Sequence, residues 1–145
     1  MARTAGMAAT IVLVLIALLH LLWAFEIPWP AKDMEGLKAA AWGEESDMPG
    51  FLPTIIVVAL LILAGWLEYS HAVGRRMPGP VWISKVMLYG VMAVFLLRGI
   101  LGFFPSFHGS MEPFITNNRL YYSPLCLLIA LLTAIVLWKG PKPVR

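Results

Sequence analysis

The chain has 145 residues, of which 60% are hydrophobic and 13% charged, and its mean hydropathy is +0.81. This composition excludes a soluble globular domain and indicates a single membrane domain over residues 1–145, without a separate catalytic domain. The net charge of +3 comes from basic residues scattered in ones and twos, which excludes a nucleic-acid-binding surface.

Four apolar segments predict an all-α, four-helix transmembrane bundle. They cover about residues 7–25, 51–69, 81–104 and 123–138, and each is near the ~20 residues that a helix needs to cross hydrocarbon. The first segment is too long for the apolar region of a signal peptide and is followed by no small-x-small cleavage site. We therefore expect it to remain as a membrane helix.

Between the first two segments lies the longest polar stretch of the chain. Within it, the run MEGLKAAAW at 34–42 predicts a short helix on the membrane surface. At the start of the fourth segment, Ser123 is a suitable N-cap residue and Pro124 suits the first helical position. The pair predicts that the fourth helix begins there.

The distribution of charge predicts the orientation, because short loops rich in Lys and Arg stay in the cytoplasm. Basic residues lie near both termini and in the loop between the second and third segments, whereas the first loop has six acids against two lysines. We therefore expect both termini in the cytoplasm and the first and third loops outside. The sequence thus predicts a multi-pass membrane protein, with the lipid bilayer as its surroundings.

One arginine, Arg98, lies inside the third apolar segment, about 9 Å from its outer end at a rise of 1.5 Å per residue. A charge near the bilayer centre costs roughly 2.5–3.5 kcal/mol on insertion scales, so such a residue needs compensation. Three interpretations stay open: the side chain extends to the headgroups, it pairs with Glu26 or Glu112, or it binds an anionic or carbonyl-bearing ligand. Gly99 and Gly102 beside it would let a helix or a ligand approach closely.

Other polar residues share this outer layer. His20 lies about 7.5 Å inside the outer end of the first segment, and Thr54 and Cys126 each lie three residues into the second and fourth. His20 is either a hydrogen-bond partner between helices or, with Trp23 on the same helical face, the wall of a pocket with Glu26 at its rim. Cys126 is either an apolar filler or a nucleophile with His20 as its base.

Toward the inner side, Glu68 and Lys85 predict an ion pair that holds the second and third helices together. No metal-binding motif, phosphate loop or HExxH sequence occurs. The histidines lack the spacing of haem ligands, which argues against haem and leaves any cofactor unknown.

Three further stretches, LHLLW at 19–23, FLLRGI at 95–100 and YYSPLCLL at 121–128, together resemble a bacterial family of four-helix membrane proteins catalogued as a domain of unknown function. That family has His-x-x-Trp at the end of helix one, Arg-Gly in helix three, and Tyr-Ser-Pro-Leu-Cys at the start of helix four. The resemblance implies the same architecture and a place in the bacterial inner (plasma) membrane, and it draws attention to the outer layer, but it implies no activity. This chain departs from the family pattern after Trp23, where relatives have glycines, and at Gly102 and Asn118, where relatives have aspartates.

Two hypotheses about function follow. In the first, an outward-facing polar pocket binds a small or lipid-like molecule or a partner subunit, with a ligand-binding set of His20, Trp23, Glu26, Arg98, Tyr122 and Cys126. In the second, the protein is a membrane enzyme acting on a lipid, quinone or sterol-like substrate, with His20 as general acid-base and Arg98 stabilising an oxyanion. The sequence assigns no catalytic residue. A transporter is less favoured, because no continuous path of polar residues reaches the inner side.

Overall fold

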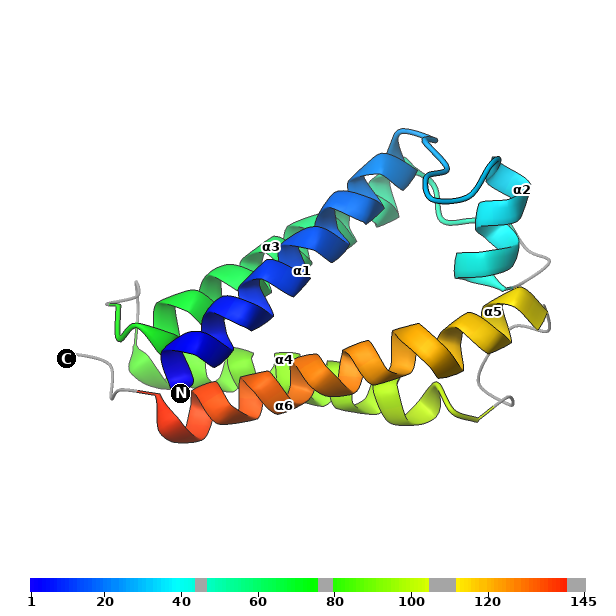
Figure 1. The fold of residues 1–145 in the computed structure, drawn as a ribbon. Helices are drawn as coiled ribbons and strands as arrows, with labels where there is room; N and C mark the ends of the chain where they lie inside the picture. Colours follow the sequence, from blue (N-terminus) through cyan, green and yellow to red (C-terminus); the bar gives the residue numbers. More distant parts are fainter. Residues whose placement is uncertain (44–46, 76–79, 105–111, 141–145) are drawn as a thin grey trace.

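A computed structural model describes residues 1–43, 47–75, 80–104 and 112–140, and throughout these ranges the regular structure is helical (Figure 1). Its main helices are α1 (Ala2–Ala24), α3 (Phe51–Ala72), α4 (Val81–Leu101) and α6 (Ser123–Lys139). The prediction of an all-α protein with four helices long and apolar enough to cross a membrane is confirmed.

Helix ends differ from the predicted segments by a few residues. α1 begins at Ala2, five residues earlier than expected, because the sequence before the apolar run contains alanines, which favour helix. α3 continues past Tyr69 to Ala72, and its last polar residues are buried against other helices. α4 ends at Leu101, where Gly102 forms the cap.

The fourth membrane helix is longer than predicted at its start. α5 (Glu112–Asn117) runs through one π-helical turn, η3 (Asn118–Tyr122), directly into α6. The prediction that Ser123 is an N-cap residue is therefore wrong: its backbone is helical, and its buried hydroxyl has no hydrogen-bond partner. Pro124 is tolerated here because it follows an irregular turn, where the regular hydrogen-bond pattern is already interrupted.

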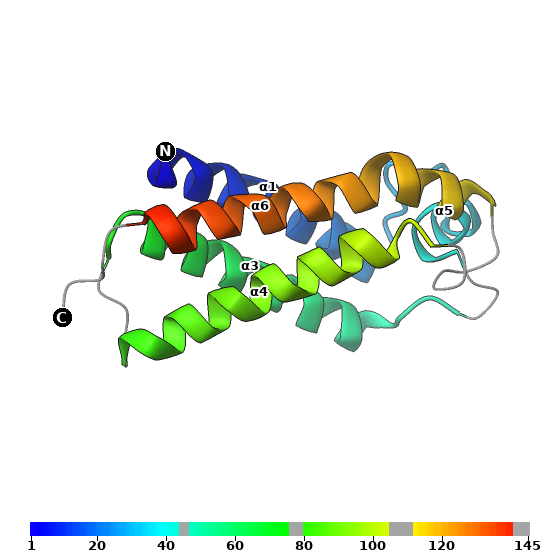
Figure 2. The same ribbon diagram turned by 90° about the horizontal axis from the view of Figure 1, so that it is seen from below.

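The helices are arranged as two pairs. α1 packs along α3 and α4 packs along α6, while contacts between α1 and α6 join the pairs. The two pairs are closest where α1 begins and α6 ends, which we call the terminal end, and they diverge toward the opposite end, which we call the cap end (Figure 1). From below, α6 lies between α1 and α4 (Figure 2).

Small residues hold the terminal end together. A Cβ on Gly6 of α1 would collide with Ala72 of α3 and would lie 3.4 Å from Val136 of α6, so glycine lets three helices meet. One turn further along, the hydroxyl of Thr10 lies 2.7 Å from the carbonyl oxygen of Gly6 and 2.9 Å from that of Gly65. The second of these contacts is a hydrogen bond between α1 and α3.

The polar residues at the terminal end are not arranged as predicted. Glu68 is completely buried, and neither of its carboxylate oxygens has a hydrogen-bond partner. The predicted ion pair between Glu68 and Lys85 is therefore wrong. Lys85 is exposed on α4, whereas the carboxyl group of Glu68 is buried next to Thr133 of α6.

A helical segment covers the cap end, where the two pairs diverge (Figure 1). It consists of α2 (Met34–Leu37), capped by the Asp33 carboxylate at 2.7 Å from the Gly36 amide, and the π-helical turn η1 (Lys38–Trp42). The prediction of a short helix in this stretch is confirmed. The segment lies against the start of the fourth membrane helix, because η1 packs on α5.

Three interactions attach this cap to the fourth membrane helix. Asn117 and Tyr122 both donate hydrogen bonds to the Ala40 carbonyl, at 3.3 and 3.0 Å. Gly43, which ends η1 with a φ of +74°, lies against the ring of Phe114 so closely that a Cβ would collide with it. The left-handed backbone and the close contact both require glycine here.

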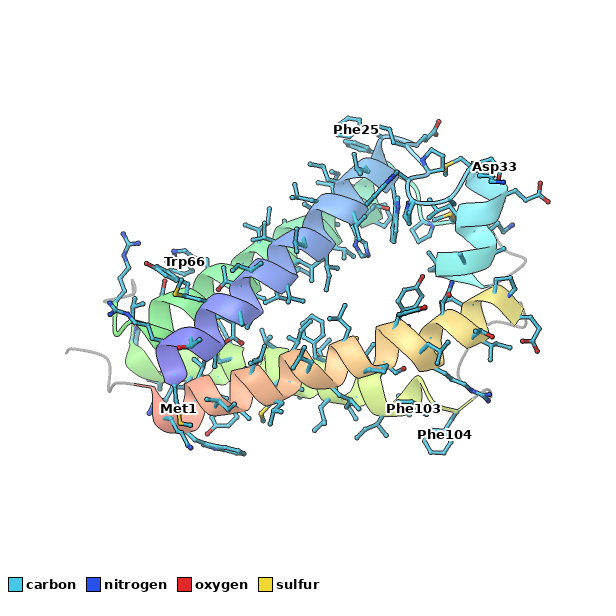
Figure 3. The ribbon with its side chains drawn as sticks, viewed as in Figure 1. Met1, Phe25, Asp33, Trp66, Phe103 and Phe104 are labelled. Carbon is cyan, nitrogen blue, oxygen red and sulfur yellow. The ribbon has the colours of Figure 1, made fainter. Side chains whose placement is uncertain are left out.

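The outer faces of the bundle are apolar, as expected of helices that contact lipid. Large hydrophobic side chains are exposed along all four long helices, and Trp66, Phe103 and Phe104 point away from the bundle (Figure 3). Trp66, Trp82 and Trp138 are exposed near the terminal end, where interfacial tryptophans are common.

Candidate functional site

A cavity of about 690 Å³ lies at the cap end of the bundle. This volume is within the usual range for small-molecule sites, and at about 30 Å³ per molecule it corresponds to roughly 20 waters. The cap, the loop that follows it and helices from both pairs contribute to the wall. The lining residues are His20, Trp23, Ala24, Glu26, Met34, Ala41, Trp42, Met48, Pro49, Gly50, Phe51, Pro53, Thr54, Val57, Arg98, Leu101 and Phe114.

Arg98 brings a positive charge to the wall of the cavity. Its side chain runs along α4 toward the cap end, because its Nη1 atom would lie 3.0 Å from a Cβ on Gly102, one turn further on. Nη1 is buried and has no hydrogen-bond partner. The predicted ion pairs with Glu26 and Glu112 are not formed, since both acids are exposed and Arg98 has no carboxylate partner among the described residues.

The two glycines beside Arg98 serve helix packing. A Cβ on Gly99 would lie 2.7 Å from the side chain of Leu127 and 3.1 Å from its backbone nitrogen. A Cβ on Gly102 would collide with Ser123. Both glycines therefore accommodate α6, and the guanidinium is held at this level by close packing of α4 on α6.

His20 faces the same cavity with a defined tautomer. Its Nδ1 lies 2.9 Å from the Ile16 carbonyl oxygen, one turn earlier on α1. A carbonyl oxygen only accepts, so Nδ1 carries the hydrogen, and in the neutral ring Nε2 is left as an acceptor. The hydrogen bond lies within α1, so it does not link helices as one interpretation of His20 required.

Trp23 stacks against the histidine and connects it to the loop after α1. The two ring centroids are 4.8 Å apart and tilted by 47°. The indole nitrogen of Trp23 donates to the Trp29 carbonyl at 2.9 Å. The loop thereby fixes one wall of the cavity.

Glu26 is exposed and borders the cavity in a left-handed backbone conformation, with a φ of 57°. This region favours glycine, and a non-glycine residue there costs about 1 kcal/mol or more. The backbone at the edge of the cavity is therefore strained at this residue.

Thr54 lines the cavity from α3, but its hydroxyl is already used. It lies 2.9 Å from the Gly50 carbonyl oxygen and 3.3 Å from that of Pro49, both at the start of the same helix. We therefore assign Thr54 a part in the shape of the cavity.

Two predicted site residues, Tyr122 and Cys126, do not line the cavity. The Tyr122 hydroxyl binds the cap through Ala40, and Cys126 is half-buried on α6. Both lie close enough to Arg98 for an electrostatic interaction with its guanidinium. α6 is turned so that these residues contact the cap and α4 instead of the cavity.

Sequence reasoning missed the walls that the cap and its flanking loop provide. Met34 and Trp42 of the cap, Met48 of the loop and Phe114 of α5 all line the cavity. The available signal was the presence of large apolar residues in an otherwise polar loop, which we interpreted as contact with the membrane surface. Within the described residues, no group of three or more His, Cys, Asp or Glu side chains is placed to bind a metal ion.

Comparison with known proteins identifies the family of this chain. It belongs to the family described as "Protein of unknown function (DUF3995)", whose model matches residues 13–133. The match includes both helix pairs and the cap. No curated protein and no solved structure matches the chain.

Proposed function

We propose that this multi-pass membrane protein binds a small, lipid-like molecule in the cavity at its cap end. The observation that carries the proposal is that Arg98 and His20 line one cavity, while the buried Nη1 atom of Arg98 has no hydrogen-bond partner among the described residues. An uncompensated charge at this depth is costly, and polar groups of this kind commonly mark binding sites in membrane proteins.

The lining residues define the chemistry of the ligand. Arg98 offers donors and a positive charge, so it suits a carbonyl, carboxylate or phosphate oxygen. The Nε2 atom of neutral His20 accepts, so it suits a hydroxyl hydrogen. The remaining wall is mostly apolar, with Met34, Phe51 and Leu101 among its residues. An amphiphile whose head group carries both an oxygen acceptor and a hydroxyl therefore fits best.

The arrangement of the helices supports entry from the lipid. α3 makes far fewer contacts with α4 than with α1, so the two helix pairs are weakly joined on that side. We expect the cap end to face outward in the bacterial plasma membrane, which would place the cavity next to the outer leaflet. The excess of acidic residues over lysines in the first loop supports this orientation.

Mass spectrometry of the purified protein tests the proposal. The wild type should retain a bound lipid-like molecule after extraction in mild detergent, and Arg98→Leu should lose it while still inserting in the membrane. The matched control is Arg119→Leu, which removes an exposed arginine outside the cavity. Equal retention in both variants would show that Arg98 only extends its charge to the membrane surface.

A partner subunit is the other occupant that the cavity admits. A side chain of a second membrane protein would make the same contacts with Arg98, and native mass spectrometry would then detect a second chain instead of a small molecule. Arg98→Leu would release that chain, whereas Arg119→Leu would not.

The alternative, a membrane enzyme acting on a lipid, quinone or sterol-like substrate, is favoured by one observation. The bond from Nδ1 to Ile16 leaves Nε2 of His20 as a base, and His20 lines the same cavity as Arg98. His20→Gln separates the two functions, because its amide retains an acceptor near the position of Nε2 but transfers no proton. Ligand retention without chemical change in both proteins would support binding, and turnover lost only in the variant would support catalysis.

A further inference from the structure

A second group of polar side chains is buried at the terminal end, far from the ligand cavity. Glu68 and Ser70 of α3 are 0% exposed, and His71 is 3% exposed. Both Glu68 oxygens, the Ser70 hydroxyl and Nδ1 of His71 are buried without a hydrogen-bond partner. The protein itself causes this burial, because α1, α4 and α6 surround the last turn of α3.

Among the described residues, the elements packed around Glu68 bring no positive charge into contact with its carboxyl group. Gly6 of α1 lies against the backbone carbonyl of Glu68, and Thr133 of α6 lies next to its carboxyl group. The Thr133 hydroxyl donates to the Ile129 carbonyl at 2.9 Å. The basic groups on neighbouring elements at this end, Arg3, Lys85, Lys139 and the N-terminus, belong to exposed residues.

An ionised carboxylate in such a place would be shielded from bulk water and would have no partner among the described residues. Burying an unpaired charge is far more costly than burying a neutral polar group. Of the eight acidic residues in the chain, Glu68 alone lies within α1, α3, α4 or α6. The burial of Glu68 therefore favours the neutral carboxylic acid over the carboxylate.

His71 lies between Glu68 and the terminal surface. His71 is three residues after Glu68 on α3 and lies on the same helical face. Measured along the helix axis, His71 is about 1.5 Å from Ala72, the last residue of α3, whereas Glu68 is about 6 Å from Ala72. A Cβ on Gly140, just beyond α6, would be 3.3 Å from the His71 ring. Lys85 of α4 interacts electrostatically with this histidine. The imidazole of His71, whose Nδ1 has no hydrogen-bond partner among the described residues, therefore lies next to the terminal end.

We propose that Glu68 is a proton-binding site of this protein, loaded from the terminal end through His71. The proton comes from water at that end, passes by way of the imidazole, and forms the O–H bond of the Glu68 carboxylic acid. On release it returns along the same path, and no oxidation or reduction is involved. The site is separate from the ligand cavity and does not depend on the function proposed for it.

Infrared spectroscopy tests the proposal directly, because a carboxylic acid has a C=O band that a carboxylate lacks. The protein is measured near pH 7 in a detergent without carbonyl groups, with and without carbon-13 glutamate. We expect one acid band that shifts with the isotope, is lost in Glu68→Gln and is retained in Glu112→Gln, which alters an exposed glutamate. A band that persists in Glu68→Gln would overturn the assignment, as would the absence of any acid band from the wild type.

The isotope shift is measured on the wild type, so it shows whether the band belongs to a protonated glutamate even if the Glu68→Gln variant fails to fold. Sodium or potassium is the competing ligand: loss of the band in either salt, but not in a choline salt, would assign the site to a metal cation and overturn the proposal. A jump to alkaline pH tests the path. His71→Phe should slow the decay of the acid band severalfold, and unchanged decay would refute the part assigned to His71.

Discussion

Replacing Gly6 by alanine tests the packing that joins the two helix pairs. The new Cβ would collide with that of Ala72 and would lie 3.0 Å from the Glu68 carbonyl oxygen and 3.4 Å from Val136 Cγ2. Neither the Ala72 methyl group nor a backbone carbonyl can change rotamer to avoid it. α1 must therefore move away from α3 and α6.

The expected magnitude combines two opposing effects. Overpacking a close contact costs about 1–3 kcal/mol, while alanine is favoured over glycine inside a helix by about 0.5–1 kcal/mol. Because the contacts at Gly6 are rigid, we expect Gly6→Ala to lower the free energy of unfolding by about 1–2 kcal/mol.

Gly90 supplies a matched control. It is also inside a long helix, α4, but a Cβ there would meet no atom within 4 Å. Gly90→Ala should therefore be neutral or raise the free energy of unfolding by up to about 1 kcal/mol. Reversible unfolding in detergent mixtures, followed by circular dichroism, measures both variants. If Gly6→Ala were as stable as Gly90→Ala, α1 would not pack on α3 and α6 as described.

Three further substitutions test interactions elsewhere in the fold. Thr10→Val removes the hydrogen bond to the Gly65 carbonyl. In the same assay it should lower the free energy of unfolding by about 0.5–2 kcal/mol, and an unchanged value would refute the bond. Tyr122→Phe removes the bond to Ala40; it should cost about 0.5–1.5 kcal/mol and speed proteolysis of the cap, and unaltered cleavage would contradict the attachment. Asp33→Ala removes the N-cap of α2 and should accelerate amide exchange there, where equal rates would count against the cap.

Much of the fold follows from sequence because hydrophobicity is a local property. Twenty apolar residues in succession form a membrane helix wherever they pack, so the number and order of the long helices could be predicted. The depth of Arg98 and His20 followed from counting along those helices, and both line one cavity. The run MEGLKAAAW likewise contained enough helical residues to predict the helix in the first loop.

The direction in which each polar residue points could not be obtained in this way. Lipid and protein interiors are similarly apolar, so a membrane helix has little amphipathic pattern to show which face contacts its neighbours. Glu68 therefore seemed suited to pair with Lys85, whereas the structure buries it without a partner. Tyr122 and Cys126 were predicted to belong to the site, but the rotation of α6 keeps them out of the cavity.

The sequence by itself determined a four-helix membrane protein with polar residues at particular depths, because composition and helical rise are sufficient for both. Only the tertiary structure decided that α1 pairs with α3 and α4 with α6, that the cap closes the diverging end, and that no acid of the described residues pairs with Arg98. These features depend on which small residues meet across helices, such as Gly6 with Ala72 and Gly102 with Ser123. Close packing between distant segments sets them, and no local pattern in the chain specifies it.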